Sequence, residues 1–134
     1  MWIRYTLIIC LGVIMGNTLA NAQSTPVLEM QCPKVRDYGG YPHTTGEIIT
    51  YRLDQSTQQV SRRTNSEWMV ICEGKSQCSV QGGEVLLSEF RADEKKLIDR
   101  HLNFVKQIEK AQEWGNPNRT NLIFGYESRC KHNK

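Results

Sequence analysis

The N-terminal residues of this chain have the three parts of a secretory signal peptide. Arg4 supplies a positively charged start, an apolar run covers 7–15, and Ala20-Asn21-Ala22 is a small-residue cleavage motif. We therefore expect a signal peptide over 1–22 and a mature protein over 23–134 that is periplasmic or secreted. Because export places its cysteines in an oxidising compartment, this segment constrains the fold of the remainder more than any other feature.

The apolar run of the signal peptide is about half the length that a membrane-spanning helix needs, and no later stretch is as long. We expect no membrane span in the mature chain. Removal of the signal peptide takes away Arg4 and leaves a small excess of basic over acidic residues. The basic clusters at 62–63 and 95–96 have polar or acidic neighbours, so no nucleic-acid partner is expected.

The mature chain contains an even number of cysteines, because Cys10 lies in the signal peptide and Cys32, Cys72, Cys78 and Cys130 remain. Two disulfides are expected, and four cysteines allow three pairings. The spacing favours Cys72 with Cys78, which bracket a short turn-forming segment, and Cys32 with Cys130, which lie near the two ends. In the chain-entropy model, closing the short loop stabilises the fold by roughly 2.4 kcal/mol and closing the long loop by about 4.7 kcal/mol.

Runs rich in β-branched and aromatic residues alternate with turn-forming residues along the mature chain. The expected strands cover 28–32, 47–53, 58–62, 68–72, 83–90 and 120–130. A loop is expected over 31–46, which is rich in glycine and proline, and a frayed tail after Cys130. This pattern predicts one domain, built as a small antiparallel barrel or sandwich.

The segment 93–114 fits two interpretations. Periodicity alone favours a helix, with Asp93 as its N-cap and Gly115 and Pro117 as its stop. The residues at helical spacing are Leu97, Ile98, His101, Leu102, Val105 and Ile108. In a strand, four apolar residues share one parity, and these are Ile98, Leu102, Phe104 and Ile108.

A short repeated pattern favours strands in the same segment. Leu53-Asp54 is followed by Val60, and Ile98-Asp99 is followed by Val105 at the same spacing. Two strand-turn-strand units would produce such a repeat.

Several short motifs occur in a characteristic order along the chain. Cys32 follows the signal peptide, the cysteine-bracketed turn 72–78 precedes the apolar residues 85–87, Ile98-Asp99-Arg100 begins a late strand, and 125–130 ends in a cysteine. This order resembles a loosely defined group of small secreted bacterial proteins, mostly alphaproteobacterial. The resemblance implies a β-rich fold and no known activity. We therefore predict an all-β fold with two disulfides, and the alternative is an α+β fold with a helix at about 93–114.

Motifs for catalysis or for cofactors are not found in the sequence. His43, His101 and His132 do not have the spacing of metal ligands, and we expect neither a metal nor a cofactor. No serine lies in a nucleophile motif, and pairing leaves no cysteine thiolate. A group of carboxylates remains as a source of acid and base chemistry if the fold brings them together: Glu84, Glu89, Asp93, Glu94 and Asp99.

The segment 37–45 is the strongest candidate for a binding surface. It places Tyr38, Tyr41 and His43 beside glycines and a proline, as many binding loops do. The alternative is that both tyrosines fold back on the core. We expect a monomeric, non-enzymatic binding or accessory protein of the bacterial envelope, such as an inhibitor, with a protein partner at this loop. The alternatives are a small secreted hydrolase that uses converged carboxylates or His43, and a barrel carrier of a small apolar ligand.

Overall fold

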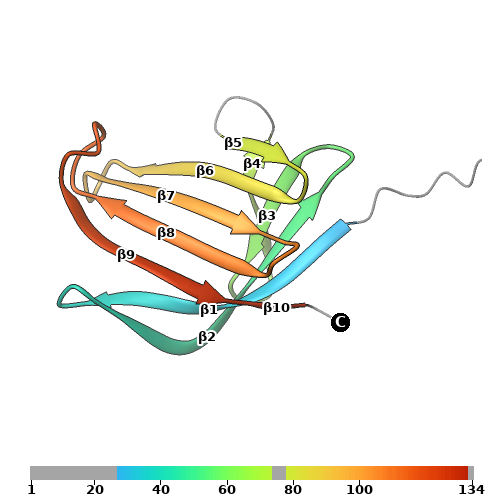
Figure 1. The fold of residues 1–134 in the computed structure, drawn as a ribbon, viewed down its shortest axis with the longest axis horizontal. Helices are drawn as coiled ribbons and strands as arrows, with labels where there is room; N and C mark the ends of the chain where they lie inside the picture. Colours follow the sequence, from blue (N-terminus) through green and yellow to red (C-terminus); the bar gives the residue numbers. More distant parts are fainter. Residues whose placement is uncertain (1–26, 74–77, 133–134) are drawn as a thin grey trace, which may run out of the picture.

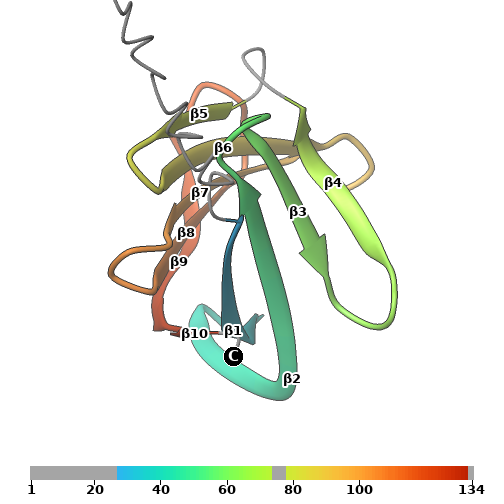
Figure 2. The same cartoon turned by 90° about the vertical axis from the view of Figure 1, so that its right-hand side faces the viewer.

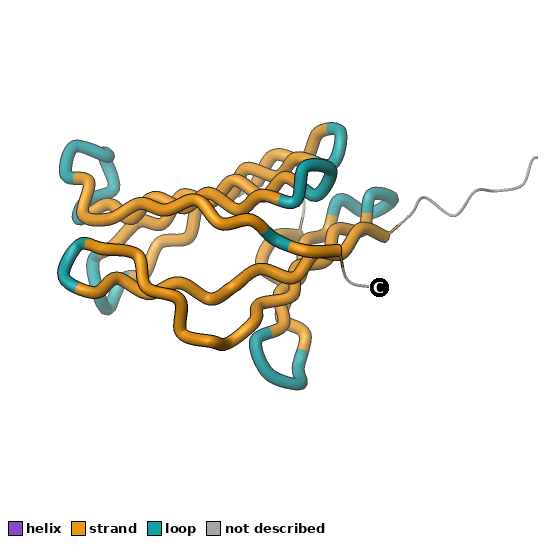
Figure 3. Tube along the Cα trace, turned by 60° about the horizontal axis from the view of Figure 1, so that its bottom comes forward, coloured by secondary structure: helices purple, strands orange, loops and turns teal. Residues whose placement is uncertain are grey.

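A computed structural model of the protein describes residues 27–73 and 78–132, and the expected signal peptide 1–22 lies outside this part. Every helix or strand element that it describes is a strand (Figure 1). The strands are β1 (Val27–Tyr38), β2 (Tyr41–Asp54), β3 (Gln59–Arg63), β4 (Trp68–Glu73), β5 (Cys78–Gln81), β6 (Glu84–Arg91), β7 (Lys96–Asn103), β8 (Ile108–Trp114), β9 (Leu122–Arg129) and β10 (Lys131–His132). Most connections are short and lie at the strand ends (Figure 3). The prediction of an all-β fold is confirmed.

The strands form two antiparallel sheets. The N-terminal sheet has the order β10-β1-β2-β3-β4, and the C-terminal sheet has the order β5-β6-β7-β8-β9. Apart from β10, neighbours in each sheet are also neighbours along the chain, so almost every pairing is a local hairpin. Seen end-on, the two sheets enclose a shared interior, with β3 and β4 on one side and β8 and β9 on the other (Figure 2).

Both predicted disulfides are present, and each one joins the two sheets. Cys72 in β4 is bonded to Cys78 in β5, and these two strands are the outermost strands of their sheets. Cys32 in β1 is bonded to Cys130, the residue at which the chain leaves β9 and enters β10. The two sheets are therefore linked covalently at two places, between the edge strands β4 and β5 and between β1 and the β9–β10 junction.

The helix considered for 93–114 is not formed, because this segment contains β7 and β8. β7 pairs with β6 along one side and with β8 along the other. In this central position Ile98, Arg100 and Leu102 alternate with outward residues and are buried between the sheets. Sheet pairing on both sides thus outweighs the helical spacing of the apolar residues.

The repeated strand-turn-strand unit exists, but its two copies align at other positions of the sequence than expected. Asp54 ends β2, and its side chain accepts hydrogen bonds from the backbone amides two and three residues later. Asn103 ends β7 and accepts the same two bonds. The true match is therefore Leu53-Asp54 with Leu102-Asn103, whereas Ile98-Asp99 lies in the middle of β7.

The prediction of a loop over 31–46 is wrong, since these residues form the far part of the β1–β2 hairpin. Tyr38 pairs with Tyr41, and the turn between them consists of Gly39 and Gly40. Their φ angles are +63° and +90°, which two-residue hairpin turns of this kind require and which glycine adopts without strain.

The core lies between the sheets and receives apolar side chains from both. Its fully buried members include Met30, Tyr51, Leu53, Val60, Val85, Leu102 and Phe104. The expected frayed tail is replaced at its start by β10, since Lys131 and His132 pair with β1. Within the part of the chain that the structure describes, no helix is long and apolar enough to cross a membrane.

Candidate functional site

The tip of the β1–β2 hairpin exposes two large aromatic side chains. Tyr38 is 78% exposed and Tyr41 is 76% exposed, so the alternative in which both fold back on the core is wrong. The ring of His43 lies beside that of Tyr38, with 6.1 Å between the ring centroids. The tip lies at the same end of the molecule as the turn between β6 and β7 (Figure 1). The three residues selected from the sequence thus share one exposed surface, called here the hairpin tip.

The backbone beneath the hairpin tip is held by local polar contacts. The side chain of Asp37 accepts a hydrogen bond from the amide of Gly40 at 2.6 Å, which fixes the turn. Further down the hairpin, Lys34 Nζ lies 2.8 Å from Glu47 Oε2 across the two strands. The hydrogen bond from Lys34 is the main cause that lowers the pKa of Glu47. These contacts limit the freedom of the hairpin before any partner binds.

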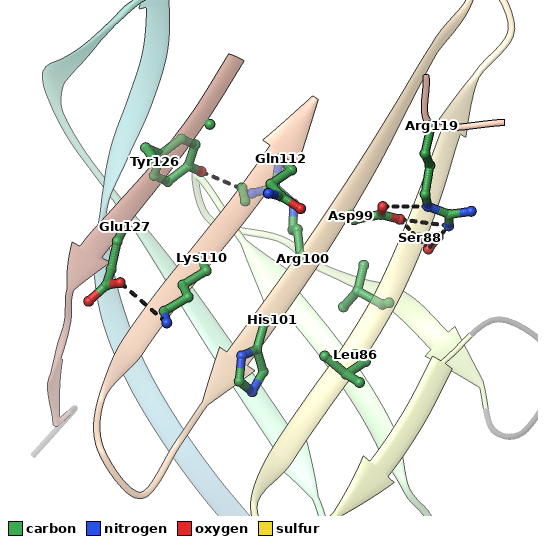
Figure 4. Close-up of a pocket in the computed structure, with 13 residues that line it drawn as sticks. Leu86, Ser88, Asp99, Arg100, His101, Lys110, Gln112, Arg119, Tyr126 and Glu127 are labelled. Carbon is green, nitrogen blue, oxygen red and sulfur yellow. Dashed lines mark hydrogen bonds and ion pairs between the residues drawn. The ribbon is translucent and has the colours of Figure 1, made fainter. Parts of the chain in front are cut away.

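A second feature is a hollow of about 590 Å³ on the outer face of the C-terminal sheet (Figure 4). Gly125 has no side chain, and the hollow lies among the longer side chains of the neighbouring strands. Its polar lining comprises Ser88, Asp99, Arg100, His101, Lys110, Gln112, Arg119, Tyr126 and Glu127. Lys110 and Glu127 form an ion pair at one side of the hollow, with 3.4 Å between Nζ and Oε2.

Asp99 and Arg119 form a two-point ion pair at the other side of the hollow. Arg119 donates from Nε to Asp99 Oδ2 at 2.6 Å and from Nη2 to Asp99 Oδ1 at 2.9 Å. Asp99 also accepts hydrogen bonds from the Ser88 hydroxyl and from the indole nitrogen of Trp114. The bond from Arg119 is the main cause that lowers the pKa of Asp99. This carboxylate is therefore charged and has many partners already.

Several hydrogen bonds hold the loop that carries Arg119. The side chain of Asn116 accepts hydrogen bonds from the amides of Thr120 and Asn121, and the amide of Gly115 donates to the carbonyl of Asn121. Arg119 itself has a φ of +57°. The arginine of the outer-face ion pair is thus carried by a loop, the β8–β9 connection, that has its own internal hydrogen bonds.

Ser88, Asp99 and His101 share the outer face, but they do not form a catalytic triad. The Ser88 hydroxyl donates to Asp99, whereas a triad serine donates to the imidazole. His101 Nε2 lies 3.6 Å from Glu84 Oε2 and points away from the Ser88 side of the hollow (Figure 4). These contacts give Ser88 no histidine base.

The carboxylates considered for acid and base chemistry are divided between the two faces of the C-terminal sheet. Glu84 and Asp99 lie on its outer face, and Glu89 lies on its inner face beside Arg62. Glu94 lies in the β6–β7 turn near Lys96. Within 27–73 and 78–132, no group of three or more acidic, histidine or cysteine side chains is arranged to hold a metal ion.

A buried polar cluster lies between the two sheets, and the sequence did not predict it. Glu109 is fully buried and accepts hydrogen bonds from the hydroxyls of Tyr51 and Tyr126. Arg100 Nη1 lies 3.4 Å from Glu109 Oε2 and donates to the Tyr126 hydroxyl at 3.0 Å. Burial is the main cause that raises the pKa of Tyr51 and raises that of Tyr126 to about 12. The cluster therefore holds one carboxylate, one guanidinium and two neutral phenols.

Comparisons with family models, with curated proteins and with solved structures give no match to this chain. The fold and its surfaces define the protein as a disulfide-linked β-sandwich with an exposed aromatic hairpin tip.

Proposed function

We propose that this protein is an exported, non-enzymatic binding protein of the bacterial envelope and that it holds a partner protein at the hairpin tip. The exposure of Tyr38 and Tyr41 is the observation that carries this proposal. Tyrosine is among the residues that contribute most to binding energy at protein interfaces, because it combines a large apolar ring with a hydroxyl group. His43 extends the same surface.

The construction of the hairpin supports a binding role. A surface that is ordered before binding loses less conformational entropy when the complex forms. The Gly39-Gly40 turn, the bond from Gly40 to Asp37 and the Lys34–Glu47 ion pair provide that order. The tyrosine side chain itself has few rotatable bonds, so its immobilisation also costs little.

The disulfides support a location outside the cytoplasm. Such bonds persist in the periplasm and outside the cell, where thiols are not kept reduced. The N-terminal signal-peptide pattern favours the same location, and so does the resemblance to small secreted bacterial proteins. An accessory or inhibitory role toward a protein of the envelope fits these features.

Site-specific photo-cross-linking in the cell tests this proposal. A photoreactive amino acid is placed at position 38 or 41 and, as a control, at position 105. Val105 is a suitable control because it is also a large exposed apolar residue and lies in the turn between β7 and β8, at the end of the molecule opposite the hairpin tip (Figure 1). We expect the same partner protein to cross-link from positions 38 and 41 and not from position 105. Equal cross-linking from position 105, or none from the two tip positions, would contradict the proposal.

A further inference from the structure

A cleft of about 540 Å³ lies between the two sheets. One wall comes from the β1–β2 hairpin and β3, and the other comes from β6–β9 and the β6–β7 turn. The β6–β7 turn lies at the same end of the molecule as the hairpin tip (Figure 1), and both the turn and the hairpin contribute residues to the lining. Its volume falls within the range of about 300–1,000 Å³ that is typical of sites for small molecules.

The lining of the cleft contains more basic than acidic side chains. The basic ones are Lys34, Arg36, Arg62, Arg91, Lys96 and Arg100, and the acidic ones are Asp37, Glu94 and Glu113. Three further carboxylates, Glu47, Glu89 and Glu109, pair with lining cations. These three carboxylates balance the excess of basic groups, so the cleft has no net charge and does not suit a polyanion.

Two guanidinium groups from opposite sheets, Arg62 and Arg100, line this cleft. Arg100 is only 9% exposed, and its contacts with Glu109 and Tyr126 both use Nη1. Its Nε is buried and has no hydrogen-bond partner within the described residues. A buried donor without a partner is unfavourable, so a ligand that accepts its hydrogen bond gains affinity. The side chain of Arg62, on β3, is 15% exposed and contacts Glu89 at 3.2 Å.

The same cleft also has an apolar wall. Val35 and Ile49 line it from the hairpin, and the ring of Tyr126 lines it from β9. The alkyl stems of the lining arginines and lysines extend this apolar surface. A ligand that fits both parts has a charged head and an apolar body.

We infer that the inter-sheet cleft binds a small organic carboxylate with an apolar body. The carboxylate lies between Arg62 and Arg100, because planar guanidinium groups match a carboxylate with paired hydrogen bonds. The apolar body lies along Val35, Ile49 and Tyr126 toward the opening. This site differs from the hairpin tip and does not depend on the proposed protein partner.

The test is a titration of the disulfide-bonded protein with decanoate, followed by ¹H–¹⁵N NMR and by calorimetry. Decanol serves as the uncharged probe and inorganic phosphate as the anion without an apolar body. We expect decanoate to bind saturably and to shift the amide signals around Ile49, Arg62 and Tyr126. Loss of the charged hydrogen bonds weakens decanol binding by about tenfold or more. Equal affinity for decanol, displacement of decanoate by phosphate at similar concentration, or no saturable binding would overturn the inference.

Charge variants locate the site. Arg62→Gln is expected to weaken decanoate binding by about tenfold, since hydrogen bonds to a charged group are lost. Lys110→Gln removes the same charge on the outer face and is expected to leave the affinity unchanged. If Arg62→Gln does not fold, Arg36→Gln at the cleft replaces it and is expected to weaken binding severalfold. Equal effects of the cleft variant and of Lys110→Gln would show that the charge acts non-specifically and would contradict the assigned site.

Discussion

Tyr51 on β2 donates a hydrogen bond to Glu109 on β8, and this bond crosses from one sheet to the other. Both residues are fully buried. Arg100 and Tyr126 complete the contacts of the Glu109 carboxylate from the C-terminal sheet. The two sheets are therefore joined by a polar cluster in the interior and by two disulfides.

Glu109→Gln should destabilise the protein strongly. The substitution keeps the size of the side chain but leaves the Arg100 guanidinium buried without a counter-charge. Breaking a buried ion pair in this way costs about 3–5 kcal/mol. Urea denaturation measures the loss. The control is Glu127→Gln, which breaks an exposed pair with Lys110 and should change the free energy of unfolding by less than about 1 kcal/mol. Similar losses in both variants would contradict the structural role of the cluster.

Alkaline pH should destabilise the protein through the buried tyrosines. Burial raises the pKa of Tyr126 to about 12, whereas a tyrosine in the unfolded chain titrates near 10. Between these values the unfolded state loses a proton that the folded state keeps, so the stabilisation is complete below about pH 10 and is lost as the pH rises toward 12. The raised pKa of Tyr51 acts in the same direction. In urea denaturation at several pH values, Tyr126→Phe should reduce the slope of stability in this window; an unchanged slope would refute this origin.

Acid pH should weaken the outer face of the C-terminal sheet. The bond from Arg119 lowers the pKa of Asp99, so this carboxylate stabilises the fold above the unfolded value near 3.9. That contribution is lost as the pH falls through the lower pKa of the folded state. Asp99→Asn should therefore reduce the dependence of the unfolding midpoint on pH below about 4. Arg119→Gln should do the same, and a full pH dependence in both variants would contradict the ion pair.

The two disulfides should differ in their contribution to stability. The Cys32–Cys130 bond spans 98 residues of sequence and the Cys72–Cys78 bond spans 6. In the chain-entropy model, their removal costs about 4.7 and roughly 2.4 kcal/mol. Chemical denaturation of the two double serine variants measures both losses. A larger loss for Cys72→Ser/Cys78→Ser would show that the chain-entropy model does not describe this sandwich.

The sequence predicted both disulfides and, in whole or in part, β1, β2, β3, β4, β6 and β9, because these depend on local patterns and on cysteine spacing. It did not predict β5 or β10. It also did not predict the far part of the β1–β2 hairpin, where Pro42 and the glycines indicated a loop. Pro42 is tolerated because β3 pairs with β2 only between Thr50 and Asp54, so this part of the hairpin has a partner on one side alone. Local composition does not reveal which residues of a strand pair with a second neighbouring strand.

The buried cluster was missed for a different reason. Strand parity places Arg100 with Ile98 and Leu102 on the inner face, and this signal was available in the sequence. The prediction that Ile108 faces the same side as Ile98 and Leu102 was wrong. The turn at 104–107 shifts the alternation of inward and outward residues, so that Glu109 points inward instead. Arg100 and Glu109 lie on neighbouring strands of one sheet, and their pairing depends on the register between β7 and β8, which spacing alone does not show.

The affinity of the cross-linked partner for the variant Tyr38→Ala/Tyr41→Ala tests the central claim most directly. Calorimetry compares this variant with the wild type and with Val105→Ala, a control at the opposite end of the molecule, after thermal unfolding has shown that all three are folded. The account predicts that the tip variant raises the Kd by about 30-fold or more, the effect of losing an interface hot spot, while its Tm stays close to that of the wild type. A Kd unchanged by Tyr38→Ala/Tyr41→Ala would contradict the claim that the hairpin tip is the binding surface.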